Sequence, residues 1–235
     1  MSVAGIMKEL AAMGSEQTRK TYARHGAPDA NFGVKIADMK TIVKRVKKDH
    51  ELALELYATG NSDAMYLAGL IADETRMTKA DLDRWAKGAT WYMISYYPVA
   101  WVAAESPHGW ALANKWIESK SELIACAGWS TLASWVALQP DEELDIAAIK
   151  ILLGRVAKDI RNAPDRLRYC MNGFIIAVGS HVLPLTAEAR ETAKAVGKVE
   201  VDMGDTACKV PDAIGCIAKV ESMGRLGRKK KQARC

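Results

Sequence analysis

The chain has 235 residues, of which 49% are hydrophobic and 26% charged, and its formal net charge is +5. This length allows one large domain or two small ones, and the composition is ordinary for a globular protein. Apolar runs long enough for a membrane span are absent, and MSVAGIMKELAAMGSEQ at the start carries Glu9 within a helical pattern, unlike a secretory signal. We therefore expect a cytoplasmic protein with no membrane partner.

Apolar residues recur at helical spacing along most of the chain, whereas the alternation typical of strands is almost absent. Ile36, Met39, Val43 and Val46 form the first clear apolar stripe. Beside it lies a row of lysines at i, i+4 and i+7 spacing, which is either a solvated helix face or part of a phosphate-binding surface. These are Lys40, Lys44 and Lys47.

Polar and proline-containing segments interrupt the helical pattern at regular intervals, as helix ends do. They are TGNSD (59–63), MTKAD (77–81), SPHG (106–109), QPDEE (139–143), NAPDR (162–166) and VLPLT (182–186). Thr78 and Asp81 resemble a capping box. The pattern predicts about a dozen helices, paired roughly every thirty to forty residues. This favours an all-α solenoid with a concave groove, and an irregular helical bundle is the alternative.

The window TWYMISYYPVAW, residues 90–101, holds five of the sixteen aromatic residues and no charge. If it is helical, Tyr92 and Tyr96 share a face, and their hydroxyl groups favour exposure. Trp129 follows a glycine, which lets a backbone or a flat ligand approach closely, although a core position is the simpler interpretation for any one tryptophan.

Positive charge gathers in two further places. Arg155, Lys158, Arg161, Arg166 and Arg168 form a second body cluster. The last eleven residues, RLGRKKKQARC, hold six cations and no acid, and without them 27 basic and 28 acidic residues leave a net charge of −1. Such a tail looks too polar to be packed and is expected to meet a polyanion, while 197–211 reads as a short extended lead-in. We expect a helical-repeat domain over 1–196 and an irregular extension with a basic tail over 197–235, which either packs on the same domain or trails it.

Catalytic and metal-binding signatures do not appear. The five cysteines lack a CxxC motif and zinc spacing, so we expect reduced thiols, no metal and no cofactor. The four histidines, near predicted helix ends, read as caps or surface residues.

The chain resembles the AlkD-like DNA alkylation repair family along nearly its full length. The resemblance rests on FGVKIADMKTIVKRVKKDHELALELYATGNSDAMYLAGLIADE, on VDMGDTACKVP and on GRLGRKKKQARC. It implies a HEAT-like helical-repeat fold that holds DNA in its concave groove. The family's glycosylases excise N3- and N7-alkylated purines, with an aromatic residue and carboxylates in a W-D-x-x-D pattern. That pattern falls here on Tyr92 to Tyr96, where both acids are missing.

The resemblance places the family's helix arginine between Cys126 and Gly128, where no arginine stands, and its later tryptophan near Phe174. A fixed negative charge beside the developing sugar cation is a large catalytic term, and a tyrosine phenol does not supply it at neutral pH.

We therefore expect a DNA-binding repair protein, a monomer, that holds damaged or distorted double-stranded DNA. Two alternatives stay open, an active alkylpurine glycosylase with an unidentified carboxylate and a helical scaffold that binds another protein. The expected DNA-binding residues are Lys40, Lys44, Lys47, Trp91, Tyr92, Tyr96, Trp129, Arg161, Arg166, Arg168, Phe174, Arg228, Lys229, Lys230 and Lys231.

Overall fold

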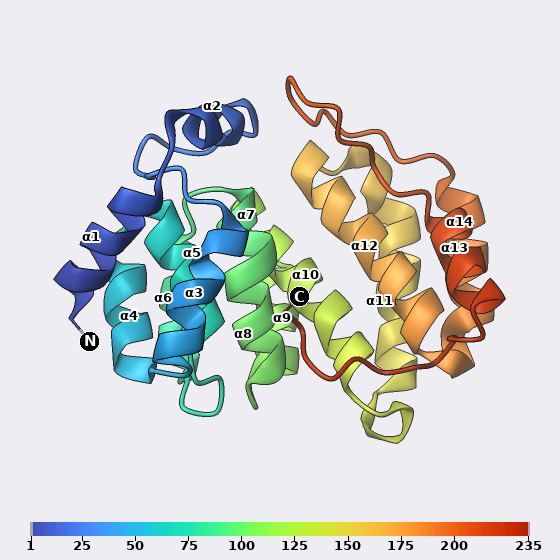
Figure 1. Cartoon of the computed structure of the whole chain (residues 1–235). Helices are drawn as coiled ribbons and strands as arrows, with labels where there is room; N and C mark the ends of the chain where they lie inside the picture. Colours follow the sequence, from blue (N-terminus) through green and yellow to red (C-terminus); the bar gives the residue numbers. More distant parts are fainter. Residues whose placement is uncertain (1, 235) are drawn as a thin grey trace.

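The computed structural model describes residues 2–234, and within them the regular structure is entirely helical (Figure 1). The helices are α1 (Val3–Met13), α2 (Glu16–Arg24), α3 (Ile36–Val46), α4 (His50–Ala58), α5 (Ser62–Ile71), α6 (Lys79–Gly88), α7 (Tyr92–Ile94), η1 (Ser95–Val99), α8 (Ala100–Glu105), α9 (Gly109–Trp116), α10 (Glu122–Leu138), η2 (Asp141–Glu143), α11 (Ile146–Asp159), η3 (Ile160–Asn162), α12 (Asp165–His181), η4 (Leu183–Leu185), α13 (Thr186–Val196) and α14 (Ala213–Ser222). Elements η2, η3 and η4 are 3₁₀ turns, and η1 is a π-helix.

The helices form two rows, as the predicted solenoid requires. In the first row, α3, α5, η1 with α8, α10, α12 and α14 each contact the next. In the second row, α4, α6, α9, α11 and α13 each cover a helix of the first row. The second-row helices begin at residues 50, 79, 109, 146 and 186, so the pairs recur at the predicted spacing. Each pair thus buries its apolar side against its neighbours.

Each of the six predicted segments lies where a helix ends or begins, and two of them, 59–63 and 77–81, supply a side-chain cap. Thr78 and Asp81 form a complete capping box at the start of α6. Asp49 and Asn61 accept hydrogen bonds from first-turn N–H groups of α4 and α5. Asp212 caps α14 in the same way. Helix α14 lies inside the extension that the sequence analysis described as irregular, so that description is wrong for 213–222.

The FGV segment, residues 32–34, is fixed to the first turn of α5 by a buried carboxylate. Asp63 accepts hydrogen bonds from the N–H groups of Phe32, Gly33 and Val34, at 2.6, 3.1 and 3.2 Å. Gly33 has a φ of +74°, and a side chain there would meet the backbone of α2. The segment therefore holds α2 and α3 in place beside α5.

Element η1 exists because α5 admits a proline against its backbone. A Cβ atom at Gly69 of α5 would lie 2.3 Å from Cβ of Pro98 in η1. Pro98 lacks an N–H group and disturbs the regular helical hydrogen bonds, and a π-turn accommodates the disturbance. The predicted helical window is therefore three short elements in line, α7, η1 and α8.

The C-terminal ends and the starts of the first-row helices lie in two separate regions of the molecule. Residues near the C-terminal ends of α5, α8, α10 and α12 all contact the chain's last ten described residues. Figure 1 shows this segment, in red, crossing the molecule from α14 to the centre. The starts of α7, α10 and α12 meet one another elsewhere, where Arg166 contacts both Tyr92 and Glu122. That meeting point defines the first part of the site.

Candidate functional site

Five residues from the end of α2, the start of α7, η1 and the start of α12 form a tyrosine–arginine cluster, defined as His25, Tyr92, Tyr96, Arg166 and Tyr169. The Arg166 guanidinium lies 4.2 Å from the centre of the Tyr92 ring. The Tyr92 hydroxyl and His25 Nδ1 share a hydrogen bond of 3.1 Å. The rings of Tyr96 and Tyr169 are stacked, with centres 5.9 Å apart. A cation held on a ring face can also receive a phosphate.

Tyr92 and Tyr96 do not share an exposed face, which corrects the sequence-based expectation. Tyr92 and Tyr97 are half-buried, whereas Tyr96 is only 6% exposed and donates a hydrogen bond to the Arg166 carbonyl oxygen. The cause is η1, because a π-turn contains one more residue than an α-turn. The residue that follows Tyr92 on the outer face is thus Tyr97.

The tyrosine hydroxyl groups of this cluster stay protonated at neutral pH. Burial raises the pKa of Tyr92, although Arg166 opposes the shift. Burial also raises the pKa of Tyr96 and of Tyr169. These groups act as neutral hydrogen-bond donors. The carboxylate that reaches the cluster is Glu122, and its Oε1 accepts a hydrogen bond of 3.1 Å from the Arg166 N–H group at the start of α12.

The second part of the site is a pocket of about 570 Å³ between α3, α5 and the end of the chain, here called the lysine pocket. Five cationic side chains stand over an apolar floor, and no acidic residue lines it among those described. Lys40, Lys44 and Lys47 form no ion pair within residues 2–234. The lining residues are Ile36, Lys40, Val43, Lys44, Lys47, Lys48, Tyr66, Leu70, Gln232 and Arg234.

Lys47 has an unusual backbone. Its φ of +61° at the end of α3 is a conformation that favours glycine, and it is the only such residue other than glycine between residues 2 and 234. Backbone strain of this kind gathers at functional sites. The strain places a lysine at the rim of the pocket.

A series of aromatic rings connects the two parts of the site. Tyr92 contacts Tyr96, Tyr96 contacts Tyr97, Tyr97 contacts Trp101, and Trp101 contacts Tyr66. Successive ring centres lie between 5.3 and 6.3 Å apart. Tyr66 also lines the lysine pocket. The aromatic window and Tyr66 therefore link the tyrosine–arginine cluster to the lysine pocket by continuous ring contacts.

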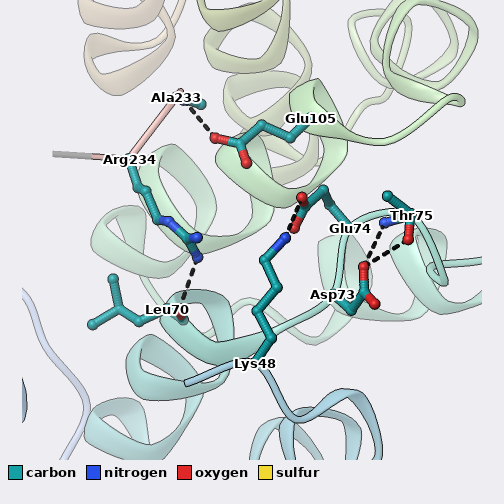
Figure 2. Close-up of polar contacts among 8 residues, drawn as sticks. All are labelled: Lys48, Leu70, Asp73, Glu74, Thr75, Glu105, Ala233 and Arg234. Atoms are coloured by element: carbon teal, nitrogen blue, oxygen red, sulfur yellow. Dashed lines mark hydrogen bonds and ion pairs between the residues drawn. The ribbon is translucent and has the colours of Figure 1, made fainter. Parts of the chain in front are cut away.

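Residues 225–234, here called the C-terminal strap, are bound to the body, which corrects the expectation of a free tail. Lys229 Nζ lies 2.7 Å from Asp141 and donates to the Val136 carbonyl oxygen. The Ala233 N–H group donates to Glu105, and Arg234 donates to the Leu70 carbonyl oxygen at 2.8 Å (Figure 2). Cationic donors suit the C-terminal ends of helices because these ends carry partial negative charge.

Other strap cations remain exposed. Arg228, Lys230 and Lys231 have exposed side chains, and the Lys230 N–H group donates to the Ala137 carbonyl oxygen. Figure 2 shows Arg234 reaching into the region of the Lys48–Glu74 pair. Cys235 lies outside the described residues. The strap thus adds charge to the surface that it crosses.

Several expected contact residues lie inside the core and do not line a surface. Trp129 and Phe174 are fully buried and pack edge to face, with ring centres 5.2 Å apart. Trp91 is 5% exposed and contacts Tyr22 and Tyr92. Amphipathic spacing reveals a helix face but not the depth at which a ring is covered. These three residues support the site from within.

The second body cluster is split in two. Arg166 belongs to the tyrosine–arginine cluster, whereas Arg161 donates to the Ala195 carbonyl oxygen of α13 and Arg168 pairs with Asp165. Arg161 and Arg168 line a separate pocket with Lys198. Helical geometry explains this outcome, since residues two positions apart point in different directions.

Sequence reasoning missed His25, Tyr66, Tyr97, Tyr169 and Arg234. His25 was predicted to be a cap or a surface residue, and it does cap α2, but its contact with Tyr92, 67 positions away in the sequence, depends on the fold. Tyr169 stands three positions after Arg166, a helical spacing that could have singled it out. Arg234 was counted with the tail, but its place in a pocket depends on the path of the strap.

The composition of the site restricts its chemistry. No group of three or more His, Cys, Asp or Glu residues able to hold a metal ion occurs among the described residues. The four cysteines between residues 2 and 234 are free thiols, and Cys208 is the exposed one.

No single helix in the described chain is long and apolar enough to cross a membrane, and α12 with the segment Leu183–Val196 meets that test only as a pair bent by 115°.

Comparison with known proteins identifies relatives of the whole chain. The sequence model of the DNA alkylation repair enzyme family matches residues 6–197. The uncharacterized protein Lin0241 of Listeria innocua is 37% identical over 220 residues, which cover 91% of this chain and 95% of that protein. The uncharacterized protein Lmo0209 of Listeria monocytogenes is 36% identical with the same coverage.

One solved structure has the same fold throughout. It is 42% identical, has a TM-score of 0.90 and covers 100% of both chains. It is described as "a new family of proteins related to the HEAT-like repeat DNA glycosylases with affinity for branched DNA structures". The predicted HEAT-like helical architecture is thereby confirmed.

Proposed function

The chain belongs to the DNA alkylation repair enzyme family, and we propose that it binds branched or distorted DNA along its first row of helices without excising a base. The observation that carries the proposal is the set of cations on that row. Lys40, Lys44 and Lys47 lack ion-pair partners among residues 2–234, and Arg166 is held on a tyrosine ring. Affinity for nucleic acid is built from several such contacts to phosphates.

The similar protein with affinity for branched DNA supports this choice of partner, because the two chains align over their full lengths. Branched DNA exposes unstacked base pairs beside a dense array of phosphates. The half-buried Tyr92 and Tyr97 offer ring faces to the unstacked base pairs, and the lysine pocket offers positive charge to the phosphates. We propose double-stranded DNA with a branch as the ligand and a monomer as the binding form.

Base excision fits this geometry less well. Departure of an alkylated purine leaves a positively charged sugar, which a fixed carboxylate would stabilise. Glu122 is the carboxylate that reaches the tyrosine–arginine cluster, and it is hydrogen-bonded to the backbone of α12. The surroundings of the rings are cationic, with Arg166 over Tyr92. We therefore propose that the family scaffold serves here for recognition.

The test is a binding and excision assay on the same protein. We expect tighter, salt-sensitive binding to a four-way junction than to a duplex of equal length, and no abasic sites in a duplex that carries N-methylpurines. Lys44→Glu should weaken binding, whereas Lys79→Glu, at an exposed position on α6, should have little effect. Salt-insensitive or absent binding would favour the protein-scaffold alternative, and abasic sites would favour the glycosylase.

A further inference from the structure

The lysine pocket is a built cavity and not only a charged patch. It is a half-open pocket, lined by residues of α3, of α5 and of the end of the C-terminal strap. Its volume of about 570 Å³ lies within the range of small-molecule sites in proteins. A contact surface for duplex phosphates alone would need no pocket of this volume, since duplex phosphates are reached from outside.

The walls of the lysine pocket combine two kinds of surface. The floor is apolar, made by Ile36, Val43 and Leu70 with the buried Tyr66. Lys40, Lys44 and Lys47 stand at the rim, and their side chains are exposed. A ligand that fits both surfaces is flat and apolar at one end and anionic at the other. A nucleotide has this composition, with its base at one end and its phosphate at the other.

The strap adds one further cation to the lysine pocket. Arg234 is held by its hydrogen bond of 2.8 Å to the Leu70 carbonyl oxygen, and the Ala233 N–H group is fixed to Glu105 (Figure 2). Lys48 is paired with Glu74, so its charge is partly neutralised. The charge available to a ligand therefore comes from three exposed lysines on and at the end of α3 and from the hydrogen-bonded guanidinium of Arg234, which can orient a phosphate by two parallel hydrogen bonds.

We propose that the lysine pocket receives an unpaired nucleotide at the branch of a branched DNA, with its base on the apolar floor and its phosphates on α3 and Arg234. This proposal rests on the proposed DNA binding and specifies which part of the DNA is recognised. A paired base cannot enter a pocket of this kind without leaving its stack, and that costs a few kcal/mol in a duplex. A base that is already unpaired at a branch enters without this cost, so the pocket selects for branches.

The experiment compares two DNA ligands by fluorescence anisotropy with the full chain. Both are nicked duplexes of equal length, and one carries a single-stranded flap of about five nucleotides. We expect the flapped ligand to bind about tenfold more tightly, a ratio set by one stacked base. Val43→Trp fills the floor without changing charge, and it should lower the ratio of flapped to unflapped affinity to about one. Lys79→Ala is the matched surface control.

A second measurement uses the unaltered protein, so that a folding defect of Val43→Trp leaves the proposal testable. A photoreactive thymine analogue in the flap should crosslink to peptides that contain Val43 or Leu70. Crosslinks that fall only elsewhere, or a Val43→Trp variant that melts like the parent and keeps the flap preference, would overturn the pocket assignment while DNA binding stands. If inorganic phosphate removes the preference and leaves duplex binding unchanged, the pocket holds a phosphate alone and the base contact is wrong. Failure of the unaltered protein to bind either DNA would overturn the proposed function as well.

Discussion

At the scale of single residues, the tyrosines of the aromatic window divide into two roles. Tyr92 is half-buried, with an arginine over its ring, and Tyr96 is buried beneath it. We expect Tyr92→Ala to weaken DNA binding by about 1–3 kcal/mol, the value of one lost base stack, with a small effect on stability. Tyr96→Ala should lower the free energy of unfolding by about 3–5 kcal/mol, because it opens a cavity. Urea unfolding and junction binding of both variants distinguish these roles, and equal stability losses would contradict them.

His25 provides a prediction about pH. Burial, Arg166 and Arg24 together hold the pKa of His25 below its ordinary value of 6.5, so the ring is neutral in the free protein at neutral pH. A DNA phosphate bound near Arg166 would favour the charged ring and raise that pKa. Binding then takes up a proton, and affinity should increase as the pH falls from 7.5 toward 6, by about threefold. His25→Gln should remove this part of the pH dependence. An unchanged pH profile in the variant would place the phosphates elsewhere.

Protonation of His25 has the opposite effect on folding stability, which it lowers. Its pKa is lower in the folded protein than in the unfolded chain, so the unfolded chain binds the proton more tightly. The stability difference between the parent and His25→Gln should therefore shift against the parent as the pH falls through 6.5 toward the lowered pKa. The side chain is partly exposed to solvent, and the expected shift in melting temperature is small.

At the scale of helices, the contact between α5 and η1 depends on a missing side chain. Gly69→Ala would place a methyl group 2.3 Å from Pro98 and should cost about 3 kcal/mol, because neither backbone can move freely. Gly154→Ala is the matched control. Gly154 lies exposed in α11 with no atom within 4 Å of the added methyl group, so this change should stabilise the protein by about 0.5–1 kcal/mol. Similar melting temperatures of both variants would show that η1 is not held by this contact.

Most helices could be predicted because their determinants are local. Apolar periodicity, first-turn prolines and capping residues such as Thr78 act within a few residues of the helix that they define. Element η1 could not be predicted in this way, since it depends on Gly69 of another helix. That one turn places Tyr96 inside and Tyr97 outside. An aromatic face was therefore predicted correctly, but the wrong tyrosine was assigned to it beside Tyr92.

At the scale of the whole molecule, the strap contributes both to the positive charge of the surface and to the stability of the fold. Its cations were visible in the sequence, but their partners are main-chain carbonyl groups 93 and 164 positions away, and no local pattern reveals such distances. Lys40 and Lys44 lie in α3 and Lys47 caps its C-terminal end, so local spacing was enough to predict that the three lie near one another. The pocket that they share with Arg234 required the fold.

Two sets of point variants in the strap should differ in their effects on stability and on DNA binding. Lys229→Ala removes an ion pair with Asp141 and a hydrogen bond to α10, and we expect a loss of about 1–2 kcal/mol in the free energy of unfolding. The double variant Arg228→Ala and Lys231→Ala changes two exposed cations, and it should weaken DNA binding while leaving stability unchanged. If the double variant lowers the melting temperature as much as Lys229→Ala does, the assigned division of roles in the strap is wrong.

The central claim is that the cations of the first row bind DNA phosphates, and the salt dependence of junction binding tests it most directly. The slope of log K against log salt concentration should be measured for the parent and for the triple variant Lys40→Ala, Lys44→Ala and Lys47→Ala. Each lost phosphate contact reduces the slope by about 0.9, so we expect the triple variant to be shallower by up to roughly 3. A triple variant that folds normally and keeps the parent's slope would contradict the assignment of this surface to DNA.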